Sequence, residues 1–230
     1  MRRSSCGVVV VALASAGVVL VGSDSADAAV VYTQSWDAGL ADWGRDTNDG
    51  EVDHVAAGGN PGGFIRRTGG EVFNRAGIAY DGPEVQGDYA AAGLNFICVD
   101  AALLRGNLNG TEKPSALNFR FRRFGDENGW LYPLDAEALG EEWVTFSASF
   151  DPTWTDVEAT ANGWVQEPAF SIPWATLMSN VQSVQLRALS DDPSTAATLI
   201  MGYDNFKLLP SPGAGVVLVA GTIAWARRRR

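Results

Sequence analysis

Residues 115–124 read SALNFRFRRF, and this stretch decides the fold. Its apolar residues Leu117, Phe119 and Phe121 alternate with polar ones, so in an extended chain they share one face. The same alternation returns in EWVTFSASF (142–150) and in SVQLRAL (183–189). A period of two is typical of antiparallel strands that bury one face and expose the other.

Other parts of the chain also favour short strands, and long helical periodicity is absent. One short helix is expected around Pro173–Asn180, with Ser171 as its cap and Pro173 in its first turn. About eight strands separated by Gly, Asn and Asp turns predict an all-β domain, a two-sheet antiparallel β-sandwich of jelly-roll type. The remaining predicted strands are Val30–Trp36, Gly63–Arg67, Leu94–Val99, Gly129–Tyr132 and Thr198–Leu208.

The N-terminal segment has the pattern of a secretory signal peptide. Two arginines near the start precede the apolar run Val8–Val21, and Ala26 and Ala28 then form an A-x-A cleavage pattern. We therefore expect residues 1–28 to be removed on export. The alternative is an uncleaved N-terminal anchor, but the apolar run is short for a helix that spans a membrane.

The C-terminal segment ends in an apolar run and a cluster of arginines. Gly213–Ala226 carries no charge and would form a helix about 21 Å long. With the residues from Leu208 onward it becomes just long enough to cross a hydrocarbon core of about 30 Å. Arg227, Arg228, Arg229 and Arg230 would then stay on the cytoplasmic side. A buried core helix is disfavoured, because the arginines could not be buried without partners.

This tail resembles a known sorting signal over Leu209–Arg230. The short motif Pro210, Ser211, Pro212, the apolar span and the terminal arginines are similar to the PEP-CTERM protein-sorting domain of bacteria with extracellular polysaccharide. The family motif is Pro-Glu-Pro, so Ser211 stands where an acid is expected. The resemblance implies an exosortase, a membrane-embedded cysteine protease, as the partner that removes or transfers the tail. The alternative is a permanent single-pass anchor.

The charge of the chain between these two segments limits its partners. From Ala29 to Leu209 there are 11 Lys and Arg against 25 Asp and Glu, a difference of −14. Such an acidic domain disfavours nucleic acid and anionic membrane surfaces as partners, and it suits calcium, which takes oxygen ligands. Cys98 is the one cysteine in this range, so an intrachain disulfide is excluded and a buried thiol is expected.

Six short motifs follow one another in residues 29–208. They are SWDAGLADW (35–43), GGNPGGFIRR (58–67), GPEVQGDYAAAGLNFICVD (82–100), ENGWLYP (127–133), EEWVTFSASF (141–150) and MGYDNFKL (201–208). Their order is similar to that in laminin IV type A-like and carbohydrate-binding-module-like jelly rolls of bacterial secreted proteins. The resemblance implies that the first and last strands meet, and that a structural calcium is held by Asp37 and Asp204. The alternative for Asp204 is a carboxylate that accepts hydrogen bonds from loop amides.

A second acid-rich stretch, DTNDGEVD (46–53), has the composition of a calcium loop. It lacks the spacing of an EF-hand, which needs a bidentate Glu at the twelfth position. We therefore expect a solvated turn there.

Three tryptophans are candidates for stacking on sugar rings. Trp143 shares the polar face of its strand with Thr145 and Ser147, while Trp154 and Trp164 lie in the polar stretch 151–164. Together they would form a glycan-binding platform. The alternative is burial, because tryptophan is mostly buried in proteins.

Catalysis has little support in the sequence. His54 is the only histidine, which excludes an ordinary zinc site, and no G-x-S-x-G elbow accompanies it. We therefore expect a non-catalytic, exported protein sorted to the cell surface, acting in adhesion or in association with an extracellular polysaccharide matrix. The alternatives are a carbohydrate-active enzyme on the same fold and a purely structural matrix component.

Overall fold

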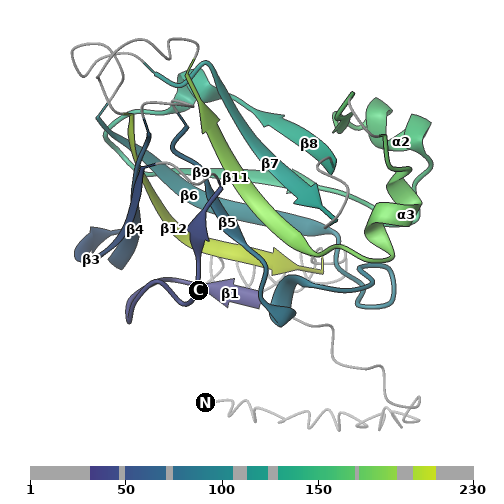
Figure 1. The fold of residues 1–230 in the computed structure, drawn as a ribbon, viewed down its shortest axis with the longest axis horizontal. Helices are drawn as coiled ribbons and strands as arrows, with labels where there is room; N and C mark the ends of the chain where they lie inside the picture. Colours follow the sequence, from purple (N-terminus) through teal and green to yellow (C-terminus); the bar gives the residue numbers. More distant parts are fainter. Residues whose placement is uncertain are drawn as a thin grey trace, which may run out of the picture.

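The computed structural model describes residues 32–46, 50–70, 75–105, 113–123, 129–168, 171–190 and 199–210. These residues form two six-stranded antiparallel sheets that pack against each other (Figure 1). The predicted all-β, two-sheet antiparallel sandwich is confirmed. The predicted signal peptide, Ser211, Pro212 and the predicted transmembrane and arginine segments lie outside the described residues.

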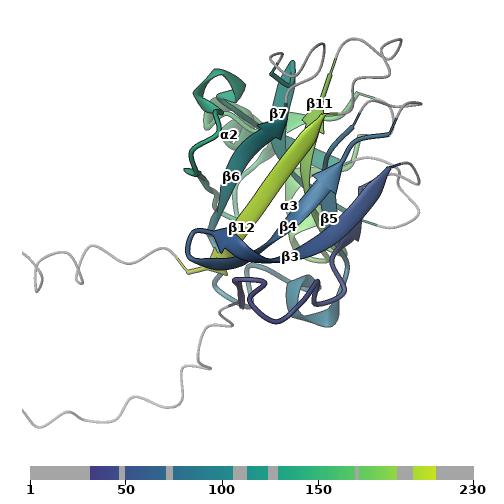
Figure 2. The same cartoon turned by 90° about the vertical axis from the view of Figure 1, so that its left-hand side faces the viewer.

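Sheet A is built around the last strand, β12, which lies between β4 and β6 (Figure 2). The first strand, β1 (Tyr32–Gln34), also pairs with β12, and Tyr32 lies opposite Leu208. The start of the described chain and the end of β12 are therefore neighbours, as the sequence resemblance implied. The other strands follow the order β3 (Glu51–Gly59), β4 (Gly62–Thr68), β12 (Ile200–Leu209), β6 (Phe96–Arg105) and β9 (Val144–Ser149).

Sheet B contains two of the three strands that the alternating pattern predicts most clearly. From β5 to β12 the chain repeatedly changes sheet, which is typical of jelly-roll connections. The strand order is β10 (Val165–Gln166), β8 (Gly129–Leu134), β7 (Ala116–Arg122), β11 (Ser183–Leu189), β5 (Ile78–Tyr80) and β2 (Gly44–Arg45).

The helices lie mainly at one end of the sandwich, beside β8 (Figure 1). The predicted helix is α3 (Trp174–Met178), next to a second helix, α2 (Asp156–Ala161), that the sequence analysis missed. The helix α2 begins with a capping box, in which Thr155 and Glu158 bond reciprocally to each other's backbone N–H groups. Two short 3₁₀ helices complete the set, η1 (Pro83–Val85) and η2 (Ala136–Ala138). Among the described residues, no helix has the length and apolar character to cross a membrane.

The expectation of a solvated turn over 46–53 is wrong at both ends of the stretch, because the side chain of Asp46 is buried and residues 51–53 belong to a strand. Glu51 opens β3, the edge strand of sheet A, and pairs with Thr68 on β4. Asp53 faces Arg66 and forms an exposed ion pair of 2.9 Å with it. The acidic residues therefore line a strand edge, where charge discourages pairing with another chain.

The core is filled by the inward residues of the alternating strands. Phe119 and Phe121 of β7 and Phe146 of β9 belong to one buried cluster between the sheets, and both phenylalanines of β7 are fully buried. Phe121 contacts Tyr89 and Phe150 edge-on, at centroid distances of 5.5 and 5.1 Å. The alternation seen in the sequence therefore assigns the buried face of these strands correctly.

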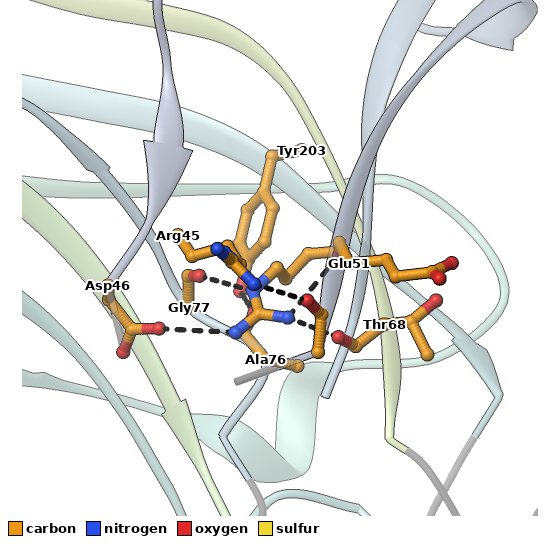
Figure 3. Close-up of polar contacts among 9 residues, drawn as sticks. Arg45, Asp46, Glu51, Thr68, Ala76, Gly77 and Tyr203 are labelled. Atoms are coloured by element: carbon orange, nitrogen blue, oxygen red, sulfur yellow. Dashed lines mark hydrogen bonds and ion pairs between the residues drawn. The ribbon is translucent and has the colours of Figure 1, made fainter. Parts of the chain in front are cut away.

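A buried guanidinium, that of Arg67, contacts segments of both sheets, and Figure 3 labels the residues that surround it. Arg67 is fully buried, and its Nε donates to the carbonyl of Gly77 at 2.9 Å. Its Nη1 donates to the carbonyls of Glu51 and Thr68, and its Nη2 lies 3.7 Å from a carboxylate oxygen of Asp46. Glu51 and Thr68 belong to sheet A, whereas Gly77 and Asp46 adjoin strands of sheet B. One side chain on β4 therefore holds both sheets together.

Two further features surround this guanidinium. The hydroxyl of Tyr203 on β12 donates to the carbonyl of Ala76 at 2.6 Å, which is a second cross-sheet bond. Neither carboxylate oxygen of Asp46 has a hydrogen-bond donor. Burial raises the pKa of the Asp46 carboxyl, because desolvation outweighs the attraction of Arg67 and two other arginines, Arg187 and Arg75.

We expect Arg67→Met to lower the free energy of unfolding by about 3–5 kcal/mol, because it leaves buried carbonyls and Asp46 without their cation. Urea unfolding of the purified protein measures this. Arg66→Met is the matched control, one residue away, where Arg66 makes only the exposed pair with Asp53. That variant should cost less than about 1 kcal/mol. Equal losses in the two variants would contradict the cross-sheet role.

We expect Asp46→Asn to flatten the pH dependence of stability above about pH 4, the ordinary pKa of an aspartate. Because its pKa is raised in the folded state, the folded protein keeps a proton that the unfolded chain loses near pH 4. The free energy of unfolding therefore falls as pH rises through this window, and asparagine removes that contribution. Urea unfolding at several pH values tests it, with Asp53→Asn as the exposed control. An unchanged slope in Asp46→Asn would show that the prediction is wrong.

Candidate functional site

The structure contradicts the prediction that Trp164 lies on a surface platform. Trp164 is fully buried and stacks on Phe121, with ring centroids 5.0 Å apart and planes 13° apart. Its Nε1 donates to the carbonyl of Ser149 at 3.2 Å. The physical reason is helix α2, which ends just before Trp164 and turns the chain back toward the core.

The three predicted tryptophans do not share one surface. Trp154 is half-buried and packs near Trp174, 6.1 Å away, and Trp164 lies 5.1 Å from the same ring. Trp143 lies far from them in the fold, beside Phe64 of sheet A. Two of the three therefore belong to an aromatic cluster under the helices, and the predicted platform is not formed.

Trp143 lies on the outer face of sheet A, as its position beside Thr145 and Ser147 predicts, but its ring is half-buried. Its Nε1 donates to the carbonyl of Gly58 on β3 at 3.1 Å, and its ring meets Phe64 edge-on at 5.4 Å. A Cβ on Gly202 would come within 2.8 Å of the ring, so a larger residue there would displace the indole. The indole therefore packs over Gly202 of β12 and Phe64 of β4 and bonds to the end of β3.

The turn between β3 and β4 is fastened onto the same face. The backbone N–H of Asn60 donates to Asp204 at 2.5 Å, and its side-chain amide donates to Asp100 at 3.2 Å. Asp100 also accepts from Asn205 at 2.8 Å and from Thr145 at 2.5 Å. Asp100 and Asp204 are consequently buried, although they lie on the outer face of their strands. The β3–β4 hairpin therefore covers this part of the outer face of sheet A.

The predicted calcium ligands both contact this hairpin. Asp204 accepts backbone N–H bonds from Asn60 and Asn205, and burial raises the pKa of its carboxyl. Asp37 accepts from the Ser35 hydroxyl and from the N–H of Gly63, which lower its pKa. These carboxylates therefore face hydrogen-bond donors. Within the described ranges no three His, Cys, Asp or Glu side chains gather as a metal site needs. Calcium also takes amide and backbone carbonyl oxygens, so its binding at Asp37 and Asp204 stays a prediction.

The two residues whose side chains could be reactive, His54 and Cys98, have structural roles. The Nε2 of His54 lies 2.7 Å from the carbonyl of Trp36, so the imidazole helps to fix the chain after β1. Cys98 is buried, as expected, and burial raises the pKa of its thiol. Neither arrangement resembles a nucleophile held beside a base.

A polar surface that the sequence analysis did not identify as a site covers the outer face of sheet B. Strands β7 and β11 lie in register there, so that three residues of one strand stand opposite three of the other. Five of the six are below 10% exposure, and Arg122 is half-buried. We call this surface, together with Glu167, the polar face; its opposed pairs are Asn118 with Arg187, Arg120 with Gln185, and Arg122 with Ser183.

Glu167 organises the centre of the polar face. Its Oε2 accepts from Arg120 Nε and Nη2 at 2.8 and 2.6 Å and from the backbone N–H of Gly129 at 2.7 Å. Its other oxygen accepts from Arg187 at 3.0 Å, and Arg120 also donates to the Gln185 side-chain carbonyl at 2.9 Å. Two guanidinium groups, one carboxylate and one amide are thereby held in fixed positions. In the sequence, only the alternation of apolar and polar residues in β7 and β11 indicated this face. Glu167 lies outside both strands, so that alternation could not include it.

A separate open hollow of about 470 Å³ lies at the sandwich edge between β2 and β3. It is lined by apolar Leu40, Trp43 and Val52 and by three charged residues, Arg45, Glu51 and Asp53, two of which already have partners. Arg45 donates to the carbonyl of Gly50 at 2.9 Å, and Asp53 pairs with Arg66. The polar face is therefore the stronger candidate site.

Comparisons with known proteins add a likeness in shape. Neither a protein-family model nor a curated protein matches the chain. A family 11 carbohydrate-binding module from Clostridium thermocellum, solved with a β-1,3-1,4-mixed-linked tetrasaccharide, is 14% identical, with a TM-score of 0.48 over 78% of this chain and 95% of that chain. The C-terminal family 22 carbohydrate binding module of Clostridium thermocellum Xyn10B is 15% identical, with a TM-score of 0.44 over 80% of this chain and 98% of that chain. Similarity at this level does not identify a ligand.

We expect Trp164→Ala to lower the free energy of unfolding by about 3–5 kcal/mol, because it empties a fully buried site. Trp143→Ala, on the outer face of sheet A, should cost only about 1–2 kcal/mol. Urea unfolding monitored by far-UV circular dichroism compares the two. If Trp143→Ala were as costly as Trp164→Ala, the assignment of the two rings to surface and core would be contradicted.

Proposed function

We propose that the protein is an exported, non-catalytic glycan-binding protein that associates with extracellular polysaccharide through the polar face. The observation that carries this proposal is the set of fixed polar side chains on the outer face of sheet B. In an antiparallel sandwich the outer face of a sheet is normally solvated and its side chains are free. Here amide, guanidinium and carboxylate groups are held by one another instead.

Such an arrangement suits the chemistry of sugars. Neighbouring hydroxyl groups on a sugar ring donate and accept hydrogen bonds in nearly one plane, and planar amide and guanidinium groups can meet two of them at once. Because the groups are already fixed, binding a glycan costs little side-chain entropy. Next to Arg120 in the same cross-strand row lie Leu131 and Val165, and Val165 is 48% exposed. These apolar residues offer contact to the non-polar face of a ring.

We propose binding without catalysis because of the contacts that the Glu167 carboxylate makes. Both oxygens of Glu167 accept bonds from arginines or a backbone N–H, which leaves the carboxylate as a structural acceptor. A glycoside hydrolase needs a second carboxyl across the substrate, one acting as acid. On the polar face as defined, Glu167 is the only carboxylate. We therefore favour binding over hydrolysis.

The location in this proposal rests on the sequence of the two terminal segments. The signal-peptide pattern ending at Ala28 supports export, and the tail that follows Pro210 supports sorting by an exosortase-like protease. The acidic domain also suits a setting outside the cell, away from nucleic acid. A membrane hold, temporary or permanent, would keep the polar face close to the cell's own polysaccharide.

We expect the double variant Asn118→Ala/Gln185→Ala to weaken glycan binding about tenfold or more, because it removes two amides from the polar face. The full-length protein, solubilised in mild detergent, is screened on a glycan array, and hits are titrated by calorimetry. The matched control is Ser147→Ala/Ser149→Ala on the exposed side of β9 in sheet A.

Circular dichroism confirms that each variant is folded. Binding that survives the Asn118/Gln185 change and is lost in Trp143→Ala would move the site to sheet A. A folded protein that binds no glycan would contradict the proposed function and favour a structural matrix role.

A further inference from the structure

The charge of the polar face is opposite to that of the domain around it. Between Ala29 and Leu209 acidic residues outnumber basic ones by 14, yet three of the 11 basic residues lie on this face. A fourth, Arg75, bridges to Leu189, the outward residue that follows Arg187 on β11. Among the described residues, the carboxylates near these arginines are Glu167 and the buried Asp46. Counted over those described residues alone, four arginines stand against two carboxylates.

Electrostatic behaviour agrees with this excess. The pKa of the Arg187 guanidinium is lowered by burial and by repulsion from Arg120 and Arg75. The pKa of Arg120 is lowered by burial as well, and the attraction of Glu167 does not fully compensate. Buried cations that repel one another gain when an anion joins them. Glu167 therefore neutralises this group only in part.

One donor on the face has no acceptor. The Nε of Arg122 is buried and makes no hydrogen bond, although a buried polar atom without a partner is costly. Arg122 follows Arg120 by two residues on β7 and stands opposite Ser183, so it extends the row of cations toward one end of the strand. Taken as a whole residue, Arg122 is half-buried, whereas the side chains of Arg120 and Arg187 are only 10% and 11% exposed. Arg122 is thus the most exposed cation of this row, although its Nε is buried.

We propose that the polar face selects an acidic glycan, with a uronic-acid carboxylate bound at Arg122 and Ser183 beside the Arg120–Glu167–Arg187 centre. This inference rests on the proposed glycan-binding function and adds the class of sugar. A carboxylate matches the planar fork of a guanidinium, and a charged hydrogen bond is stronger than a neutral one. The acidic remainder of the domain repels polyanions, so an acidic chain is directed to this one surface.

The test compares polymers that differ only in charge. Polygalacturonate and alginate are each titrated beside their methyl-esterified forms, using the full-length protein in mild detergent and calorimetry or interferometry. We expect at least one acid form to bind about tenfold or more tightly than its ester, because a charge-assisted hydrogen bond is lost on esterification. Binding of the acid form should weaken as salt rises, while binding of the ester should not.

Variants then assign the effect to the arginine. Arg122→Gln should remove the preference for the acid form, so that the acid and ester forms bind with about the same affinity. The control, Arg66→Gln, makes the same change in charge on the outer face of sheet A and should keep the preference. Dextran sulfate serves as a polyanion without carboxylates and should bind more weakly than the preferred uronan.

The outcomes separate the two proposals. If acid and ester forms bind equally and the Asn118→Ala/Gln185→Ala variant loses both, the proposed function stands and selection of an acidic sugar is overturned. If dextran sulfate binds as tightly as the uronans, the face attracts charge without recognising a carboxylate, and the inference also fails. If the folded protein binds neither these polymers nor any glycan on the array, both proposals fall together.

Discussion

The sandwich depends on one buried cation at the junction of its sheets. A sheet packed on another through apolar side chains alone can slide, because the hydrophobic effect has no direction. Arg67 removes that freedom at one end, since its donors reach carbonyls of β3 and β4 in sheet A and the segment before β5 in sheet B. Hydrogen bonds of fixed length set the relative position of the sheets there. The aromatic core can then pack in a single arrangement.

The alternating strands were predictable because a period of two is a strong and local signal. In SALNFRFRRF the apolar parity identified the buried face, and Phe119 and Phe121 do lie in the core. Strand β3 was missed because its acidic residues resemble a turn when read alone. Only its pairing with β4, which supplies Arg66 for Asp53, makes a strand of it. Such pairing is a non-local fact that local sequence does not contain.

For the candidate site, the sequence predicted only which side chains of the two strands face away from the core. That Arg120 and Arg122 face away from the core follows from the same alternation. That they meet Gln185 and Ser183 depends on the register between β7 and β11, and Glu167 arrives from another segment altogether. The prediction for Trp164 was wrong for a related reason. The polar composition around Trp164 suggested a surface loop, whereas Thr155 and Glu158 form a capping box that marks the start of a helix. A short helix was enough to bury that ring.

The pairing of β1 with the end of β12 brings both ends of the sandwich to one place. Tyr32 lies opposite Leu208, so the segments on either side of the sandwich join it at neighbouring points of sheet A. If a terminal segment holds the protein, as we propose, the domain is attached at one point and can rotate about it. The outer face of sheet B belongs to the other sheet, so this rotation would expose it to the surroundings on all sides of the attachment.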